Sequence, residues 1–410
     1  YTNMENRSLW EYRLRLSREE KELFAAYLWE LGDRATMDYR FLDENCASVL
    51  LWILKTIRPD FDIATNNSIF IPPPEIVQIA ERQGLVESVH FHPSLMERLR
   101  SKIERMNPAQ KRIFSKVVAT TGPTEGMNDR LILEAVLDHL AIRRHRHRGE
   151  LPKELAGLER TTLLERSKLE DRGESEFLEA LKPDFPHAAH APMRLQLGLA
   201  FDNEASRRVF KIRPALHGLL DREAGYLKNS SIEILELELR SAPERSIYLE
   251  RVILGSFSNF NPANFYEAPL SWGAEGRLQR EGSSLENGDT YFVETDGRVG
   301  YSVEFGGPRF LAYGMLAIGA KSRSVKPYGL LEAGPQAGLI FSSGKWKLNT
   351  QVEYAFQGPQ SEVPALWRLA HQQRFEISKA WAWLASYRME RTPWPNFRAE
   401  QIQFSAGYYF

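Results

Sequence analysis

The pattern of apolar and polar residues changes its period once along the chain. From residue 8 to about residue 175 the apolar positions recur at helical spacing, and from PDFPHAAHAP (residues 183–192) onward they alternate with polar positions. Alternation with a period of two places successive side chains on opposite faces of a strand. The sequence therefore predicts a helical N-terminal part and an all-β C-terminal part.

Local signals mark where several helices start and stop. Ser17 and Glu20 form a capping box before an apolar stripe, and Gly32 ends that stripe. A second helix should begin just after Asn45 and stop before Pro59, because proline cannot continue a helix. Further amphipathic helices are predicted over residues 95–118, 127–147 and 152–182.

The C-terminal part repeats one strand pattern. In MRLQLGLAF (residues 193–201) the odd-numbered apolar residues share one face, while Arg194 and Gln196 share the other. About twelve such segments follow one another, separated by turn sequences such as ENGD, GGP and SSGK. This rhythm is typical of a closed antiparallel barrel.

Aromatic placement favours a membrane barrel over a soluble one, which would show the same alternation. Trp381, Trp383 and Tyr387 share one face of a predicted strand, and the chain ends on Phe410. Bilayer interfaces favour aromatic girdles on an outward apolar band. A last strand that ends in phenylalanine also resembles the terminal signal of bacterial outer-membrane barrels. We therefore predict an outer-membrane barrel.

Composition and charge exclude some functions. The 53 Lys and Arg residues balance 54 Asp and Glu residues, so the chain lacks the basic field that nucleic-acid binding requires. A single cysteine cannot form an internal disulfide. A chain of 410 residues is long enough for two or three domains. It starts with YTNMENRSLW, and we expect it to be a piece of a longer protein.

The lone cysteine, Cys46, is the first candidate for chemistry. It follows Asn45 at the predicted start of a helix, and the unpaired N–H groups there stabilise a thiolate. Cys46 can equally be a small buried residue under an amphipathic helix. Asp43 and Glu44 can orient a base or a substrate amine, or simply stabilise the helix N-terminus.

Three segments resemble the Lnb-type periplasmic domain family, whose name refers to a lipoprotein N-acyltransferase. They are ENRSLWEYRLRLSREEKELFAAYLWEL, DYRFLDENCASVLLWILKTIRPDFDI and IPPPEIVQIAERQGLV, and the resemblance covers residues 3 to 95. It implies half of a circularly permuted papain-like fold with Cys46 as nucleophile. Asn45, Tyr39 and Asp43 would then be supporting residues.

The sequence departs from that family in its histidines. The family's general base is a histidine in a strand upstream of the cysteine, whereas the first histidine here is His90. We expect the base to precede Tyr1. The alternative is that His90 or His92, in a predicted strand or loop, replaces it; a surface pair is the simpler interpretation.

A later stretch resembles the β-barrel domain that follows Lnb-type domains in many proteobacterial proteins. It comprises RPALHGLLDREAGYLKNSSIEILELELR (residues 213–240) and YEAPLSWG (residues 266–273). The resemblance implies an outer-membrane barrel that carries a periplasmic module. The first of these sequences is expected to form a plug or a turn above the first hairpin.

The other histidines are expected to be structural. His145 and His147, two residues apart on a helix, point to different faces among arginines, so a solvated helix end or a lipid-headgroup contact is favoured over a metal site. His187, His190 and His217 lie at the junction with the barrel. No cofactor and no metal are predicted.

These observations predict a multidomain α+β protein. Residues 1–95 form the C-terminal part of a papain-like domain, residues 96–188 a helical linker, and residues 189–410 an antiparallel barrel of about twelve strands. The predicted function is a cysteine acyltransferase or acyl hydrolase that acts on lipid or lipoprotein acyl groups. The alternatives are a cysteine peptidase or peptidoglycan amidase, and a non-catalytic barrel for transport or assembly. The sequence predicts no oligomeric state.

Overall fold

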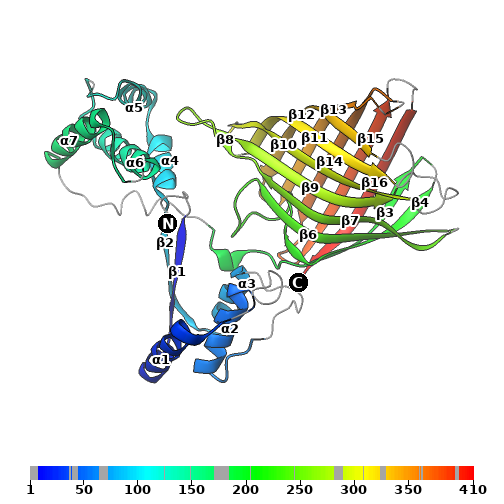
Figure 1. Ribbon diagram of the computed structural model, residues 1–410, viewed down its shortest axis with the longest axis horizontal. Helices are drawn as coiled ribbons and strands as arrows, with labels where there is room; N and C mark the ends of the chain where they lie inside the picture. Colours follow the sequence, from blue (N-terminus) through cyan, green and yellow to red (C-terminus); the bar gives the residue numbers. More distant parts are fainter. Residues whose placement is uncertain are drawn as a thin grey trace. The chain divides into compact units, whose positions relative to one another are not determined.

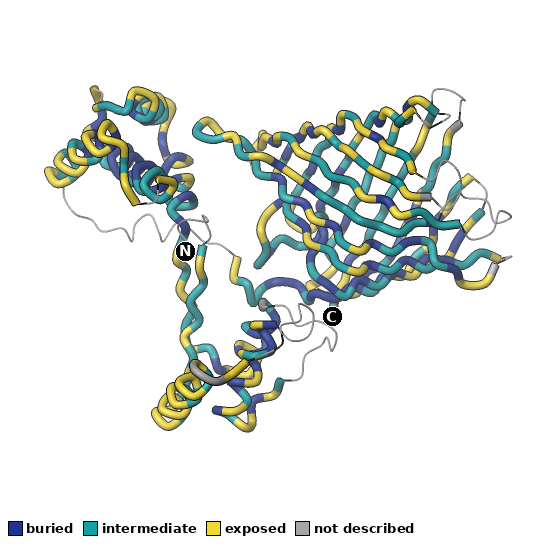
Figure 2. The backbone as a smooth tube through the Cα atoms, in the orientation of Figure 1, coloured by how far each residue is buried: buried dark blue, intermediate teal, exposed yellow. Residues whose placement is uncertain are grey.

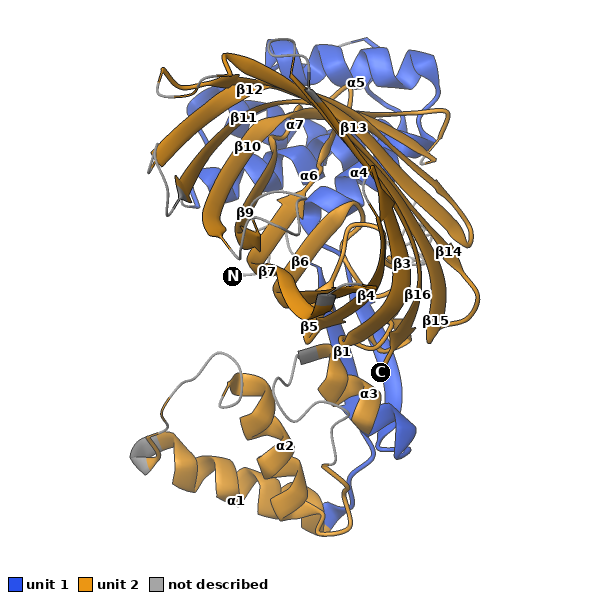
Figure 3. Cartoon of the chain, turned by 90° about the vertical axis from the view of Figure 1, so that its right-hand side faces the viewer, with its two compact units in different colours: residues 1–18, 80–183 blue, residues 19–79, 184–410 orange. Residues whose placement is uncertain are grey.

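The computed structural model describes residues 8–36, 38, 45–63, 73–123, 125–147, 149–169, 184–203, 205–243, 245–280, 290–307, 309–323, 329–359, 361, 363–392 and 397–410. The chain divides into two compact units, residues 1–18 with 80–183 and residues 19–79 with 184–410 (Figure 3). Each unit is described by itself. Seven helices precede the C-terminal strands in the described part of the chain (Figure 1).

The first unit combines a strand pair with four helices. Strand β1 (Leu9–Leu14) pairs antiparallel with β2 (Val86–His92). Helix α6 (Arg130–Arg146) packs against the other three helices, and their contact surface buries Leu99, Phe114, Val117, Leu133 and Leu158. The other three are α4 (Leu95–Arg105), α5 (Pro108–Thr120) and α7 (Lys153–Ser167).

Two predictions for this unit were wrong. Helical spacing was predicted from residue 8, but Leu9–Leu14 is a strand, because its hydrogen-bond partner β2 lies far along the chain. The single helix predicted over residues 95–118 is two helices. Asn107 caps the second through Ala109 N–H and Gln110 N–H, and Pro108 has no N–H with which to continue the first.

The second unit begins with three helices, α1 (Arg18–Arg34), α2 (Cys46–Ile57) and α3 (Pro73–Arg82). The first two start where the sequence predicted. Helix α2 buries Leu51, Leu54 and Ile57 along one face. Within the described residues, none of the helices combines the length and the apolar character that crossing a bilayer demands.

Twelve antiparallel strands form a closed barrel, as predicted (Figure 1). Each strand pairs with the next in chain order, and the last strand pairs with the first, which closes the ring. The strands are β3 (Arg194–Asp202), β4 (Ser206–Arg213), β6 (Ser230–Ala242), β7 (Arg245–Asn259), β9 (Ser271–Arg280), β10 (Tyr291–Phe305), β11 (Phe310–Arg323), β12 (Gly329–Ser343), β13 (Trp346–Gln357), β14 (Ala365–Glu376), β15 (Trp381–Thr392) and β16 (Phe397–Tyr409). Short strands β5 (Ala215–His217) and β8 (Pro262–Ala263) and the 3₁₀ turn η1 (Pro186–Ala188) complete the unit.

The two faces of the barrel differ as the sequence pattern predicts. On β3 the outward residues Leu197 and Leu199 are about half exposed, whereas the inward Gln196 is buried. Figure 2 shows this alternation of buried and exposed positions along the strands. A barrel that is apolar outside and polar inside suits a bilayer, where every backbone group must be paired within the protein.

An aromatic girdle surrounds one end of the barrel. Phe305 stacks on Phe310, which contacts Phe341, which in turn contacts Trp346, with ring centroids 4.9 to 5.4 Å apart. Further round the same end, Trp381 of β15 lies 4.8 Å from Tyr408 of β16. We call this the terminal end, because the barrel chain both enters and leaves there, with Met193 and Phe410 joined by two backbone hydrogen bonds.

Residues 218–229, the lumen loop, fold into the terminal end. Leu219 packs against a buried cluster formed by Phe260, Leu311, Tyr313, Met315 and Ile340. Glu223 accepts a hydrogen bond from Lys347 Nζ at 2.6 Å on the far side of the barrel. The segment thus crosses the lumen, in agreement with the predicted plug.

Candidate functional site

Cys46 is exposed at the first position of α2. The side chain of Asn45, itself buried, accepts hydrogen bonds from Ala47 N–H at 2.8 Å and Ser48 N–H at 3.2 Å. The hydroxyl of Ser48 donates back to the Asn45 carbonyl at 2.8 Å, which locks the cap. As the first residue of α2, Cys46 has a backbone N–H that no carbonyl within the helix can accept.

Two predicted supporting residues, Tyr39 and Asp43, lie outside the described residues, as does Glu44. Asn45 is therefore the supporting residue whose position the structure gives. It acts on the helix start rather than on the thiol directly.

The candidate histidines His90 and His92 lie on β2 in the other unit. His90 Nε2 is hydrogen-bonded to the hydroxyl of Ser88 at 3.2 Å, and His92 Nε2 lies 2.9 Å from Glu11 Oε2 on β1. Hydrogen bonds from Arg13 and then His92 lower the pKa of the Glu11 carboxyl. Both histidines are thus engaged with neighbours on their own sheet.

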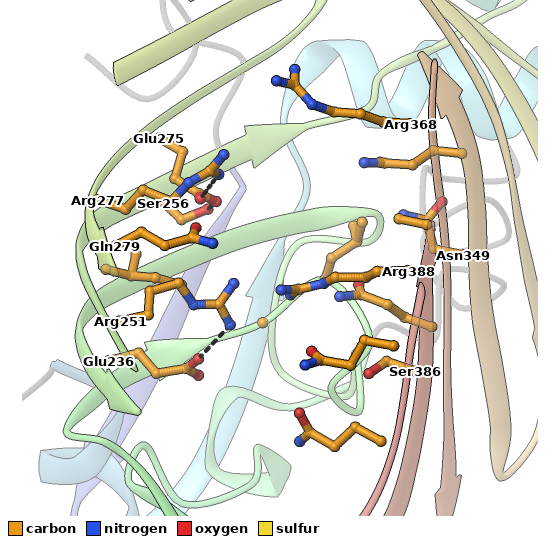
Figure 4. A pocket seen from close by; sticks show the side chains of 18 of the residues that line it. Glu236, Arg251, Ser256, Glu275, Arg277, Gln279, Asn349, Arg368, Ser386 and Arg388 are labelled. Atoms are coloured by element: carbon orange, nitrogen blue, oxygen red, sulfur yellow. Dashed lines mark hydrogen bonds and ion pairs between the residues drawn. The ribbon is translucent and has the colours of Figure 1, made fainter. Parts of the chain in front are cut away.

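The barrel lumen is the second candidate site. It contains a cavity of about 620 Å³ lined mainly by charged and amide side chains (Figure 4). Many of these charges are paired, within one strand or between strands. Arg277 contacts Glu275 at 2.5 Å and Glu294 at 2.8 Å, and Arg368 is held by three carboxylates at 2.6 to 2.9 Å.

The sequence predicted a polar face opposite the apolar face of each strand, but it did not predict which charged residues pair. The sequence does show that arginines and glutamates occupy the polar face of most strands, which indicates that ion pairs form there. Which of them meet depends on strand register. Arg368 reaches Glu390 on β15 and Glu332 on β12, two strands away in the opposite direction.

A third cluster, His190, His217 and Asp221, lies buried at the terminal end, with candidate ligand atoms within 4.8 Å of one another. These atoms already bind protein groups. His190 Nε2 and His217 Nδ1 are hydrogen-bonded at 2.9 Å, and Arg213 lies 2.6 Å from Asp221. The His217 ring also stacks on Tyr226 at 4.1 Å. An arginine at that distance disfavours a bound cation, so the cluster fits a structural network better than a metal site.

The closed ring of strands, with apolar residues outside and charged residues inside, defines an outer-membrane β-barrel protein. The family comparisons agree. Residues 183–409 match the model of a domain of unknown function, DUF7840, over more than half of the chain, and the chain belongs to that family. Residues 1–83 match the Lnb N-terminal periplasmic domain. The protein is therefore an outer-membrane barrel with a periplasmic N-terminal domain, as predicted.

Solved outer-membrane proteins are similar to the barrel part. A loop deletion mutant of OmpT from Vibrio cholerae is 12% identical, with 53% of this chain and 97% of that chain covered and a TM-score of 0.28. Omp33 from Acinetobacter baumannii is 12% identical, with 54% and 99% covered and a TM-score of 0.28. The transport unit of the autotransporter AIDA-I from Escherichia coli is 10% identical, with 59% and 93% covered and a TM-score of 0.30. None of the curated proteins is significantly similar in sequence.

Proposed function

We propose that this protein is an outer-membrane-anchored periplasmic cysteine enzyme that transfers or hydrolyses acyl groups, with Cys46 as nucleophile. The exposed thiol at the first position of α2 supports this proposal more than any other observation. A helix start offers unpaired N–H groups to a thiolate and to the oxyanion that forms when it attacks. The match of residues 1–83 to the Lnb N-terminal periplasmic domain also supports the proposal, because Cys46 lies within the matched residues.

The proposed reaction has two steps. The Cys46 thiolate attacks the carbonyl of a lipid ester or amide, the Cys46 N–H donates to the oxyanion, and the alcohol or amine leaves with a proton. The resulting thioester is then attacked by water in a hydrolase, or by an amine in a transferase, which restores the thiol. A histidine moves the proton in both steps. Lipid or lipoprotein is the proposed acyl source.

Thiol labelling tests the nucleophile. Cys46 is the only cysteine in these 410 residues, so the iodoacetamide reaction is followed on the peptide that contains it. At about pH 6 we expect Cys46 to label about tenfold faster than free cysteine. The matched control is Cys46→Ser combined with Lys55→Cys, which moves the thiol to the other end of α2 and should remove the rate advantage.

The outcome separates the candidate functions. A Cys46 thiol that labels no faster than the Lys55→Cys control would leave the non-catalytic barrel, for transport or assembly, as the function. If labelling is fast, lipid-ester and peptide substrates distinguish an acyl enzyme from a peptidase or amidase. The Cys46→Ser variant should lose the activity in either case.

A further inference from the structure

Among the described residues that line the lumen, Arg388 lies outside the ion-pair network. Arg388 on β15 lines the cavity, and in the described part of the barrel no carboxylate oxygen lies within 4.0 Å of its guanidinium. The other cations nearby are paired, as Arg277 and Arg368 illustrate. A cation that faces a confined lumen without a counter-charge attracts an anion.

The surroundings of Arg388 are locally positive. Glu238, which is 1% exposed, is shared by Lys211 at 3.0 Å, Arg240 at 2.6 Å and Arg251 at 2.9 Å. Glu238 also attracts Arg388, but among the described residues none of its oxygens lies within 4.0 Å of that guanidinium. Arg240 also contacts Glu250 at 3.3 Å and Arg251 also contacts Glu236 at 3.9 Å, so these carboxylates are engaged by cations other than Arg388.

A second arginine, Arg251 on β7, faces Arg388 from the other side of the lumen. Figure 4 shows the guanidinium groups of Arg251 and Arg388 pointing toward one another across the lumen, so their like charges repel. Both ion pairs of Arg251, to Glu238 and to Glu236 at 3.9 Å, use Nη2. Within the described residues, its Nε–H is buried without a hydrogen-bond partner.

Two opposed guanidinium groups suit an oxyanion between them. Each presents a planar fork of N–H donors that matches the geometry of carboxylate and phosphate oxygens. Binding an anion there would offset the like-charge repulsion and give Arg388 a counter-charge. Gln279 on β9 and Ser386 on β15 line the same cavity and offer further polar contacts (Figure 4).

We propose that the barrel lumen binds a small anionic solute whose phosphate or carboxylate group sits between Arg251 and Arg388. The cavity of about 620 Å³ exceeds a lone inorganic ion and falls in the range of small-molecule sites. This site goes beyond the proposed function, since it involves neither Cys46 nor the periplasmic domain. It gives the barrel a binding role of its own.

The test titrates the full chain, folded in an uncharged detergent, with inorganic phosphate and separately with acetate at constant ionic strength. Isothermal calorimetry should detect binding to the unaltered protein, and Arg388→Gln should weaken it about tenfold or more. Arg388→Gln leaves no carboxylate unpaired, so the barrel should fold. The control Arg391→Gln removes the same charge from β15 at an exposed position that does not line the cavity, and should leave binding unchanged.

The two titrations distinguish the kinds of solute that the lumen binds. Binding of phosphate alone indicates a phosphate-bearing solute, and binding of acetate alone indicates a carboxylate-bearing one. A second readout is the temperature at which the barrel unfolds, which phosphate or acetate should raise in the unaltered protein and not in Arg388→Gln. Equal binding by the unaltered protein and Arg388→Gln, or no binding and no temperature shift with either anion, overturns the proposal.

Discussion

At the scale of single residues, His139 shows how burial controls a charge in the helical unit. It lies on α6 with 7% of its surface exposed. Removal from water, followed by the nearby charges of Arg143 and Arg146, lowers the pKa of His139 to about 4. The imidazole is therefore neutral in the folded protein at neutral pH.

This shift predicts that the helical unit weakens in mild acid. The ordinary pKa of histidine is 6.5, so between that value and about 4 the unfolded state takes up a proton that the folded state does not. The free energy of unfolding should fall by about 3 kcal/mol as pH drops through this window. Hydrogen exchange of the α6 amides, corrected for intrinsic rates, should show faster opening at about pH 4.5 than at about pH 7.

The matched variant is His139→Gln, which keeps a polar side chain of similar reach and cannot titrate in this range. Its α6 amides should lose most of the extra opening in acid. An equally strong acid effect in His139→Gln would assign the effect to other groups.

At the scale of elements, close packing on the inner face of the barrel depends on a glycine beside an aromatic ring. Tyr313 on β11 pairs with Gly338 on β12, and a Cβ at Gly338 would lie 2.3 Å from the Tyr313 ring. The ring thus occupies the space that a side chain would need. The Tyr313 hydroxyl donates to Asn349 at 3.0 Å on β13, so the contact spans three strands.

Substituting Gly338→Val should displace Tyr313 and break its hydrogen bond to Asn349. The expected loss of barrel stability is about 1 to 3 kcal/mol, typical of overpacking. Gly314→Val is the control, because a Cβ there meets nothing within 4 Å. The midpoint of urea unfolding, followed by tryptophan fluorescence, measures both; equal midpoints for the two variants would contradict the packing argument.

At the scale of the whole barrel, Asp221 holds the terminal end together. From the lumen loop it accepts hydrogen bonds from Tyr409 at 2.6 Å on β16 and from Arg194 at 3.3 Å on β3, and it pairs with Arg213 at 2.6 Å at the end of β4. It thereby joins the first and last strands to the loop that crosses the lumen. Asp221 and Arg213 are both buried.

Asp221→Asn should destabilise the closed barrel. The buried Arg213 would retain Glu233 but lose its closest counter-charge, at a cost of about 3 to 5 kcal/mol. The temperature at which the folded barrel converts to the unfolded band on a detergent gel should therefore fall. Glu304→Gln, which removes a carboxylate from an exposed position near the end of β10, should leave that temperature unchanged. A variant Asp221→Asn as heat-resistant as Glu304→Gln would refute this role.

The sequence by itself determined the features that depend on local periodicity and local caps. Alternation assigned the twelve strands and their inner and outer faces, because the direction of each side chain follows from its position along its own strand. Asn45 and Pro59 likewise determined the bounds of α2. Local periodicity did not predict strand β1, since its partner β2 lies more than seventy residues away in the chain.

Only the tertiary structure decided which groups meet. Glu238, Arg251 and Arg388 lie on β6, β7 and β15, and their separation in the lumen depends on barrel closure and strand register. The exposure of the Cys46 thiol likewise depends on how α2 packs. The environment of each of these residues is set by neighbours that are distant in sequence. A local sequence pattern therefore cannot predict it.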